Sequence, residues 1–285
     1  MPRARMHDGA YLDVTVVGDG PAIVVPVRTK PVDGPTAEQM RAWGADPDLG
    51  QTLANGLAAA GLRVIAADYE GHLAEAPKPH TLTATNVAAD LLAIADAAGA
   101  DRFAYYGYSW LALAGLQLAI RTDRLTALAM GGYPPLGGPY AAMLTVTRAT
   151  HRMALANQGK QLDPDPPAPG DWEASEVTLS PDQAQQYLTL YESLQDFSDR
   201  AALDRLTIPR LAFAGEKDNI TYGPKWDNSY VAIAEPLLKN RGELTERGWT
   251  VEIVPDADHV SAMQAAKVLP ILVPWLTSHL AAPTG

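Results

Sequence analysis

Three residues with complementary acid–base chemistry follow three separate apolar segments of the chain. Ser109, Asp218 and His259 each come at or shortly after the end of a short apolar run, in the order serine, aspartate, histidine. A serine hydroxyl is a poor nucleophile near neutral pH unless an adjacent base removes its proton. Histidine can supply that base, and a carboxylate beside it fixes the imidazole tautomer and stabilises the protonated ring. The three residue types therefore predict nucleophilic catalysis on an acyl carbonyl, provided that folding brings them together.

Each of the three residues also has a simpler structural interpretation. Ser109 precedes a helical segment and has the residue type of a helix N-cap. Asp218 has the residue type of a turn that caps the next helix, and His259 would be a loop residue or part of an N-cap with Asp258. The carboxylates that compete with Asp218 for the role of the acid are Glu216, Asp256 and Asp258. The combination of all three residues favours catalysis more strongly than any one of them.

The serine lies in the segment GYSWL, residues 107–111, where a predicted strand ends and a predicted helix begins. A tight turn of this kind exposes the serine Oγ at the edge of a sheet. Small residues two positions before and after the serine usually let the turn close; Gly107 meets this requirement and Leu111 does not. Small residues on the following helix would permit close packing near the turn, and they are Ala112, Ala114 and Gly115.

Apolar strand-like segments alternate with helical segments along most of the chain. The predicted strands are Tyr11–Val17, Ala22–Val27, Arg63–Tyr69, Phe103–Tyr108, Leu125–Met130, Arg210–Ala214 and Thr250–Val254. The predicted helices are Pro47–Ala60, Thr83–Ala98, Trp110–Arg121, Tyr140–Gln158, Pro181–Phe197, Asn228–Arg247 with a break at Pro236, and Ser261–Leu280. This alternation predicts an α/β fold with a doubly wound, mostly parallel sheet. We expect a core over residues 8–136 and 206–283, and a helical cap over residues 137–205, which lack a strand pattern.

The order of the three residues and the place of the cap resemble the α/β-hydrolase fold family over about residues 10 to 280. The segment DYEGH, residues 68–72, resembles a loop that is common in capped members of that family. The resemblance implies a capped serine esterase or lactonase, with Ser109 as nucleophile, His259 as general base and Asp218 as the orienting acid. Together with the segment PVRTKP, residues 26–31, this loop is also loosely similar to hydrolases that open macrolide lactones.

The family resemblance also implies an oxyanion hole made of two backbone N–H groups. One is expected from Trp110, the residue after the nucleophile. Capped members often carry His-Gly after the third strand, and this chain does not. Pro26 has no N–H, so the second donor would be Val27 or Arg28, of which we prefer Arg28.

Aromatic residues in or near the cap predict a roomy apolar pocket for a bulky ester or lactone. The candidates are Tyr133, Tyr140, Trp172 and Tyr187. Packing of the cap helices against one another is the alternative role for these side chains.

The composition excludes several other classes of protein. A net charge of −11 without a cluster of Lys and Arg argues against nucleic acid and against an anionic membrane surface. The absence of cysteine removes disulfides and thiolate chemistry. The N-terminal segment lacks the apolar stretch of a signal peptide, so we expect a cytoplasmic protein. We expect a small-molecule substrate and no metal or organic cofactor, and a homodimer is left open.

Two further readings of the same residues remain. A cofactor-free perhydrolase or haloperoxidase would use the same three side chains, and a non-catalytic ligand-binding protein could retain them. A dinucleotide site at Gly18-Asp19-Gly20 is excluded because Pro21 and a strand follow where a helix would have to begin. A serine rather than an aspartate at position 109 argues against dehalogenase and epoxide hydrolase chemistry.

Overall fold

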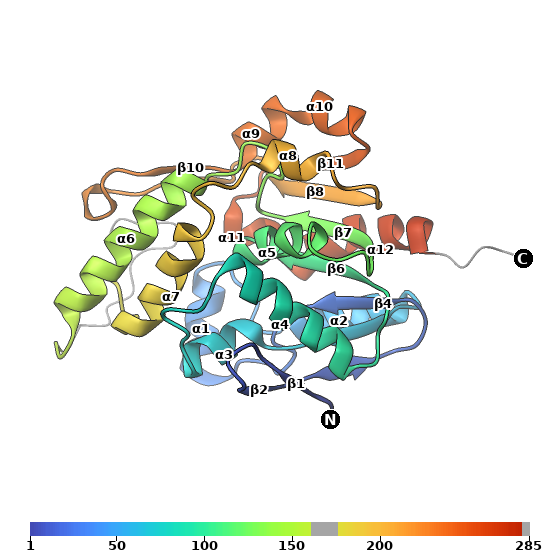
Figure 1. Ribbon diagram of the computed structural model, residues 1–285, viewed down its shortest axis with the longest axis horizontal. Helices are drawn as coiled ribbons and strands as arrows, with labels where there is room; N and C mark the ends of the chain where they lie inside the picture. Colours follow the sequence, from blue (N-terminus) through green and yellow to red (C-terminus); the bar gives the residue numbers. More distant parts are fainter. Residues whose placement is uncertain (161–175, 281–285) are drawn as a thin grey trace, which may run out of the picture.

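A seven-stranded sheet forms the centre of the computed structural model, which describes residues 1–160 and 176–280 (Figure 1). In spatial order its strands are β11 (Trp249–Val254), β8 (Arg210–Gly215), β7 (Leu125–Gly131), β6 (Phe103–Tyr108), β4 (Ala22–Val25), β5 (Arg63–Ala66) and β3 (Thr15–Val17). Only the edge strand β3 runs antiparallel to its neighbour within this sheet. The predicted α/β architecture with a mostly parallel sheet is therefore confirmed.

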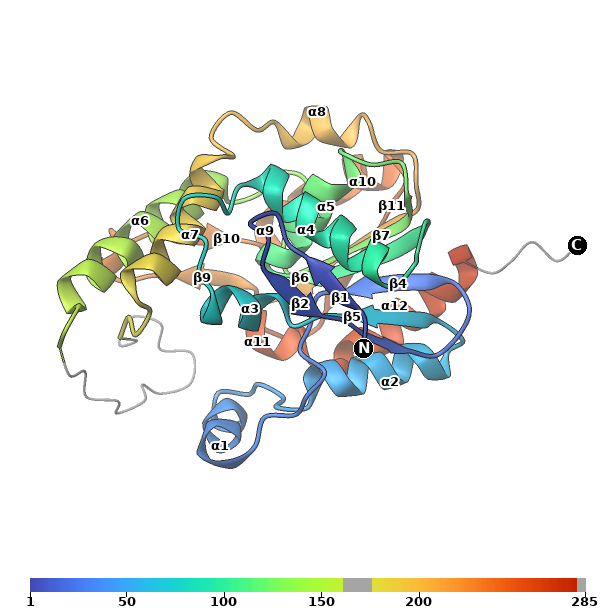
Figure 2. The same ribbon diagram turned by 60° about the horizontal axis from the view of Figure 1, so that its bottom comes forward.

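Helices cover both faces of the sheet (Figure 2). The helices on one face are α2 (Leu49–Ala59) and α12 (Ala265–Leu280), and those on the other are α4 (Ala84–Ala97) and α5 (Trp110–Ala119). Strand β4 shows why both faces are apolar. Ile23 and Val25 pack in the core with α2 and α12, whereas Val24 packs in the opposite core with α4 and α5, because successive side chains of a strand point to opposite faces.

The predicted strand Arg63–Tyr69 is too long. Strand β5 ends at Ala66, and helix α3 (Tyr69–Glu75) begins where the strand was expected to continue. The Asp68 side chain caps this helix by accepting a hydrogen bond of 2.9 Å from the Gly71 N–H. The prediction failed because the apolar pattern runs on to Tyr69, whereas the N-cap carboxylate decides the backbone conformation.

The N-terminal region also differs from the expected single edge strand Tyr11–Val17. It splits into β2 (Tyr11–Asp13), which pairs with the unpredicted strand β1 (Arg3–Arg5), and β3, which joins the main sheet. The side chain of Val14, between β2 and β3, is fully buried. The two halves of the segment thus serve different sheets.

The segment Asn228–Arg247 is not broadly helical, as the sequence pattern predicted. Strand β10 (Tyr230–Ala232) pairs with β9 (Asn219–Thr221), and the short helices α9 (Ala234–Lys239) and α10 (Arg241–Glu246) follow. The Asn219 Oδ1 accepts hydrogen bonds from the backbone N–H groups of Ile233 (3.0 Å) and Glu235 (3.3 Å). These bonds hold the second strand of the hairpin to Asn219, about fourteen positions earlier in the chain. Helix propensity is a local property and does not include a contact over this distance.

Two long helices lie beyond one side of the sheet (Figure 1). They are α6 (Tyr140–Asn157) and α7 (Pro181–Glu192), and they pack against each other. Helix α7 begins with a capping box between Ser180 and Gln183. The smaller elements of the chain are α1 (Gly34–Ala42), α8 (Asp199–Leu203), the 3₁₀ turn Pro224–Trp226 and α11 (His259–Ala262). The proposed boundaries of the cap at 137 and 205 stay a prediction.

Helix α7 is tied to the core by hydrogen bonds to the loop after α3. The Gln186 Oε1 accepts a bond of 3.0 Å from the Lys78 N–H, and the Thr189 hydroxyl donates one of 2.6 Å to the Pro79 carbonyl. The same loop is held to the N-terminal hairpin, because the buried Lys78 ammonium pairs with Asp8. The position of α7 therefore depends on polar contacts as well as on apolar packing.

A buried carboxylate anchors the N-terminal hairpin to α4. Asp90 is fully buried, and its Oδ1 accepts a hydrogen bond of 2.6 Å from the His7 N–H. Its Oδ2 bonds the His7 Nδ1 at 2.8 Å and accepts a bond of 2.7 Å from the Tyr69 hydroxyl. Both carboxylate oxygens are therefore satisfied, as a buried carboxylate requires.

We predict that Asp90→Ala lowers the free energy of unfolding by about 3 kcal/mol, because it leaves buried donors without an acceptor. Asp96→Ala on the same helix is the control, since Asp96 is 62% exposed in its surface ion pair with Arg124 and its loss should cost under about 0.5 kcal/mol. Denaturant unfolding of both variants measures the difference. Equal costs for the two substitutions would contradict the role assigned to Asp90.

Candidate active site

Ser109 occupies the tight turn between β6 and α5. Its backbone has φ 57° and ψ −132°, a conformation that costs a non-glycine residue free energy and persists only where the surroundings enforce it. The Ser109 N–H donates a hydrogen bond of 2.8 Å to the Gly131 carbonyl at the end of β7. Ser109 occupies the N-cap position of α5, but its Oγ makes no capping bond to the helix, so the side chain does not act as a cap.

Close packing explains the small residues around the turn. A Cβ atom on Gly107 would lie 2.4 Å from the Leu111 carbonyl oxygen, and one on Gly115 would lie 2.4 Å from the Tyr105 ring. The Tyr105 hydroxyl donates a hydrogen bond of 2.8 Å to the same Leu111 carbonyl. The turn thus requires a glycine before the serine, while the Leu111 side chain lines a cavity beside the turn and is accommodated there.

The three residues singled out in the sequence meet at one edge of the sheet. The His259 Nε2 lies 3.0 Å from the Ser109 Oγ, and its Nδ1 lies 2.8 Å from the Asp218 Oδ1. The loops after β6, β8 and β11 supply the three side chains, and these strands run parallel, so their carboxyl ends share an edge. Asp218 is fully buried, and the His259 side chain is 16% exposed. This is the arrangement that a nucleophile, its base and an orienting acid require.

The competing carboxylates are engaged elsewhere. Asp258 caps α11 through the backbone N–H of Ser261 at 2.8 Å, and Asp256 pairs with Lys217 at 3.0 Å on the surface. The Glu216 carboxylate accepts a bond of 3.1 Å from the Asp256 N–H. Only Asp218, among the described carboxylates, bonds the ring of His259.

Tyr108 supports the histidine and was not identified from the sequence. Its hydroxyl donates a hydrogen bond of 2.9 Å to the His259 carbonyl, and the two rings lie 5.3 Å apart. Burial, reinforced by the charge of Asp218, holds the pKa of the Tyr108 phenol well above its ordinary value, so the hydroxyl stays a donor. Its only sequence signal is its place directly before Ser109.

Two candidate oxyanion donors can be located. The Trp110 N–H is at the first position of α5, where backbone N–H groups have no partner within the helix. The Val27 N–H donates to the Val25 carbonyl at 2.8 Å, which removes the alternative donor. The Arg28 side chain bonds the Lys30 carbonyl in its own loop at 2.8 Å, and the assignment of the Arg28 N–H stays a prediction.

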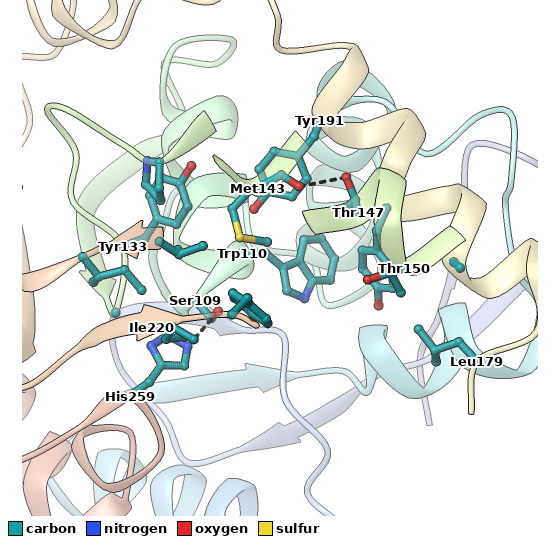
Figure 3. A pocket seen from close by; sticks show the side chains of 17 residues that line it. Ser109, Trp110, Tyr133, Met143, Thr147, Thr150, Leu179, Tyr191, Ile220 and His259 are labelled. Atoms are coloured by element: carbon teal, nitrogen blue, oxygen red, sulfur yellow. Dashed lines mark hydrogen bonds between the residues drawn. The ribbon is translucent and has the colours of Figure 1, made fainter. Parts of the chain in front are cut away.

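An apolar cavity of about 280 Å³, which we call the cap cavity, opens above the serine (Figure 3). Ser109 and His259 lie at one edge of it, and Met143 and Tyr191 from the two long helices lie across it. The hairpin β9–β10 supplies a third wall, which sequence reasoning missed. Its contributions to the lining are Ile220, Tyr222 and Val231.

The predicted pocket residues take three different positions. Tyr133 and Tyr187 line the cap cavity. Tyr140 lies behind this lining, with its ring 5.9 Å from that of Tyr133 and 5.5 Å from that of Phe197, so it packs the cap rather than the cavity. Trp172 lies outside the described residues.

A second cavity of about 340 Å³ shares Ser109, Trp110 and His259 with the cap cavity. Its wall includes Glu70 at the start of α3 and the loop that follows β4. The serine is therefore reached from two cavities, with the Trp110 side chain in the lining of both.

Within residues 1–160 and 176–280 the structure contains no candidate metal site and no candidate membrane span. No group of three His, Asp or Glu side chains there could hold a metal ion. No helix of that part of the chain is long and apolar enough to cross a bilayer.

Comparison with solved structures places this architecture among known ones. An enol-lactonase from Burkholderia xenovorans is 22% identical (TM-score 0.58), and the match covers 97% of this chain and all of the lactonase chain. A hydrolase from Pseudomonas aeruginosa is 20% identical, with 98% of each chain covered and a TM-score of 0.59. An esterase from Thermogutta terrifontis is 15% identical, with 98% of each chain covered and a TM-score of 0.62. The chain has the α/β-hydrolase fold.

The comparisons support this assignment at the level of architecture. No protein-family model and no curated protein matches the sequence. At these identities the likeness concerns the α/β-hydrolase fold alone, and the roles of individual residues depend on the geometry described above.

We predict that Gly107→Ala lowers the free energy of unfolding by about 1–3 kcal/mol, because the added methyl group overlaps a backbone carbonyl at the centre of the α/β-hydrolase fold. Gly242→Ala is the matched control. A Cβ at Gly242, in α10, meets nothing within 4 Å, so this change should be neutral or stabilise by about 0.5 kcal/mol. Denaturant unfolding distinguishes the two, and a Gly107→Ala protein as stable as Gly242→Ala would refute the packing argument.

Proposed function

We propose that this protein is a serine hydrolase that cleaves a carboxylic ester or lactone through an acyl-enzyme. One observation carries the proposal: the Ser109 Oγ, His259 and Asp218 form a continuous hydrogen-bonded chain that ends in an apolar cavity. A structural histidine–aspartate pair would not need a serine in a strained turn at the cavity wall.

In the first half of the reaction, the His259 Nε2 accepts the Ser109 proton as the Oγ attacks the acyl carbon. Asp218 holds the imidazole with its Nδ1 protonated and stabilises the imidazolium that forms. The backbone N–H of Trp110 donates to the developing oxyanion, with Arg28 as the proposed second donor, and each such donor contributes about 10²–10³ in rate. His259 then returns the proton to the departing alkoxide, which leaves as an alcohol.

In the second half, a water molecule takes the place of the alcohol. His259 removes a proton from this water as its oxygen attacks the acyl-enzyme carbonyl. Collapse of the second tetrahedral intermediate returns the proton to the Ser109 Oγ and releases the carboxylic acid. For a lactone, the alcohol and the acid are two ends of one product.

The substrate we propose carries a bulky apolar group, because apolar and aromatic side chains dominate the lining of the cap cavity. The fold of the chain is similar to that of an enol-lactonase and of esterases, which supports both substrate classes. A macrolide-type lactone is a further candidate substrate, because residues 26–31 and 68–72 are loosely similar to hydrolases that open macrolide lactones.

A peroxide-dependent activity is the second candidate. Two of the similar structures are described as bromoperoxidases, from Bacillus anthracis and, as a putative enzyme, from Mycobacterium tuberculosis, with TM-scores of 0.60 and 0.63. The same three side chains would form a peracid if hydrogen peroxide replaced water in the second half-reaction. In the presence of bromide, which the peracid would oxidise to hypobromite, bromination of monochlorodimedone that requires both acetate and hydrogen peroxide would favour this candidate over simple hydrolysis.

We predict that Ser109→Ala lowers kcat for a p-nitrophenyl ester about 10⁶-fold, because the nucleophile is lost. Ser278→Ala on α12, where the hydroxyl bonds the Trp275 carbonyl and the neighbouring His279, should keep wild-type turnover. A fluorophosphonate label, mapped by mass spectrometry, should be found on Ser109. Labelling of a different serine, or turnover that survives Ser109→Ala, would overturn the proposed nucleophile.

We predict that Asp218→Asn lowers kcat about 10⁴-fold, because the amide no longer holds the productive tautomer of His259. Asp256→Asn, a surface change after the neighbouring strand, is the control and should retain wild-type turnover. Steady-state kinetics on both variants, with folding checked by circular dichroism, tests the assignment. If Asp256→Asn lost activity and Asp218→Asn did not, the acid would be misassigned.

A further inference from the structure

Mostly apolar residues line the second cavity, together with the polar Ser109 and His259 and one carboxylate. Val25, Leu53 and Met263 are among its aliphatic side chains, and of the described residues Glu70 is the only acidic one in its lining. The catalytic Ser109 opens into this cavity as well as into the cap cavity. A charged group in such surroundings loses hydration, which has to be compensated by a partner.

Among the described residues, Glu70 has one side-chain hydrogen-bond partner and forms no ion pair. The Trp110 indole Nε1–H donates a bond of 2.6 Å to the Glu70 Oε1. The like-charged Asp68 also acts on the carboxyl, and no Lys or Arg among the described residues forms an ion pair with it. The side chain remains accessible from the cleft although protein atoms surround it, and this desolvation raises the pKa of the Glu70 carboxyl. An accessible, poorly compensated carboxylate favours binding of a cation.

Three aromatic residues are part of the lining of the same cavity. They are Tyr106, Tyr108 and Trp110. The faces of such rings attract a cation, and a carboxylate combined with aromatic rings is the usual setting for quaternary ammonium groups. A strongly hydrated ammonium gains less binding free energy in these apolar surroundings than an alkylated one. The methyl groups of the alkylated ammonium add apolar surface that binding removes from water.

We propose that the second cavity binds an alkylated ammonium group of the substrate, with the Glu70 carboxylate as its counter-ion and the aromatic rings as its walls. This inference deepens the proposed function, on which it rests, because it specifies one part of the molecule that Ser109 attacks. Glu70 is then a specificity-determining residue, and its bond to Trp110 fixes the carboxylate toward the cavity.

A purely structural role for Glu70 is the alternative, since its bond orients the Trp110 ring. Glu70→Gln separates the two roles, because the Gln amide oxygen can still accept a bond from the Trp110 indole but carries no charge. The matched control is Glu75→Gln, which removes the same charge from the exposed end of the same helix, outside the cavity lining.

Binding is measured first, with ligands that contain no ester. The probes are (2-hydroxyethyl)trimethylammonium and 3,3-dimethylbutan-1-ol, which have nearly the same shape and differ in charge. Ligand-observed NMR should give a Kd about 10-fold lower for the cation with the wild-type protein. This ratio should fall to near one in Glu70→Gln and persist in Glu75→Gln. A ratio near one in the wild type, or an undiminished ratio in Glu70→Gln, would overturn the proposal.

The acetate esters of the same two alcohols connect the binding site to catalysis. We expect kcat/KM to favour the cationic ester about 10-fold in the wild type, mainly through KM, and to lose this preference in Glu70→Gln. Ser109-dependent hydrolysis of both esters without a preference for the cation would reject the ammonium site and keep the proposed function. Glu70-dependent binding of the cation without hydrolysis of either ester would keep the site and reject the esterase.

Discussion

The strained backbone of Ser109 is the constraint on which the rest of the site depends. A positive φ at a non-glycine residue requires its surroundings to hold it, and here β6, α5 and the end of β7 converge on the turn. The absence of a Cβ at Gly107 lets the Leu111 carbonyl approach, and the Tyr105 hydroxyl bonds that carbonyl from below. The free energy stored in the turn is thus offset by the packing of the central strands. In this backbone conformation the Oγ points away from the end of α5 and towards His259.

The parts of the fold that the sequence predicts are those fixed by local pattern. Apolar runs after turns predicted the strands β6, β7 and β8 closely, and their order along the chain predicted that Ser109, Asp218 and His259 would share an edge. Apolar patterns did not predict the secondary structure correctly where one polar side chain, or a contact between distant residues, decides the backbone conformation. The side chain of Asp68 ends the strand before it, and that of Asn219 holds a hairpin in a segment that reads as helical.

The same distinction holds within the site. Residue type and order along the chain were enough to single out Ser109, Asp218 and His259. A serine, an aspartate and a histidine that each follow an apolar segment form a combination that favours catalysis more strongly than any one of them. The environment of the serine was harder to foresee. Tyr140 turns into the packing of the cap, whereas Ile220 in the hairpin faces the cavity, and neither orientation has a periodic signal. Glu70 belongs to the segment DYEGH, which the sequence marks only by its resemblance to a loop of capped family members. Its place beside Trp110 depends on how α3 and α5 meet.

The hydrogen bonds that hold α7 to the loop after α3 bear on how the cavity discriminates between molecules. Gln186 and Thr189 bond the helix to backbone groups, and the pairing of the buried Lys78 with Asp8 ties that backbone to the first strands of the chain. A wall held by these bonds would resist displacement by a molecule that enters the cavity. Oversized molecules would be rejected by steric exclusion on this side, and the scope of accepted shapes would be set by the side chains that the helix presents, such as Tyr187.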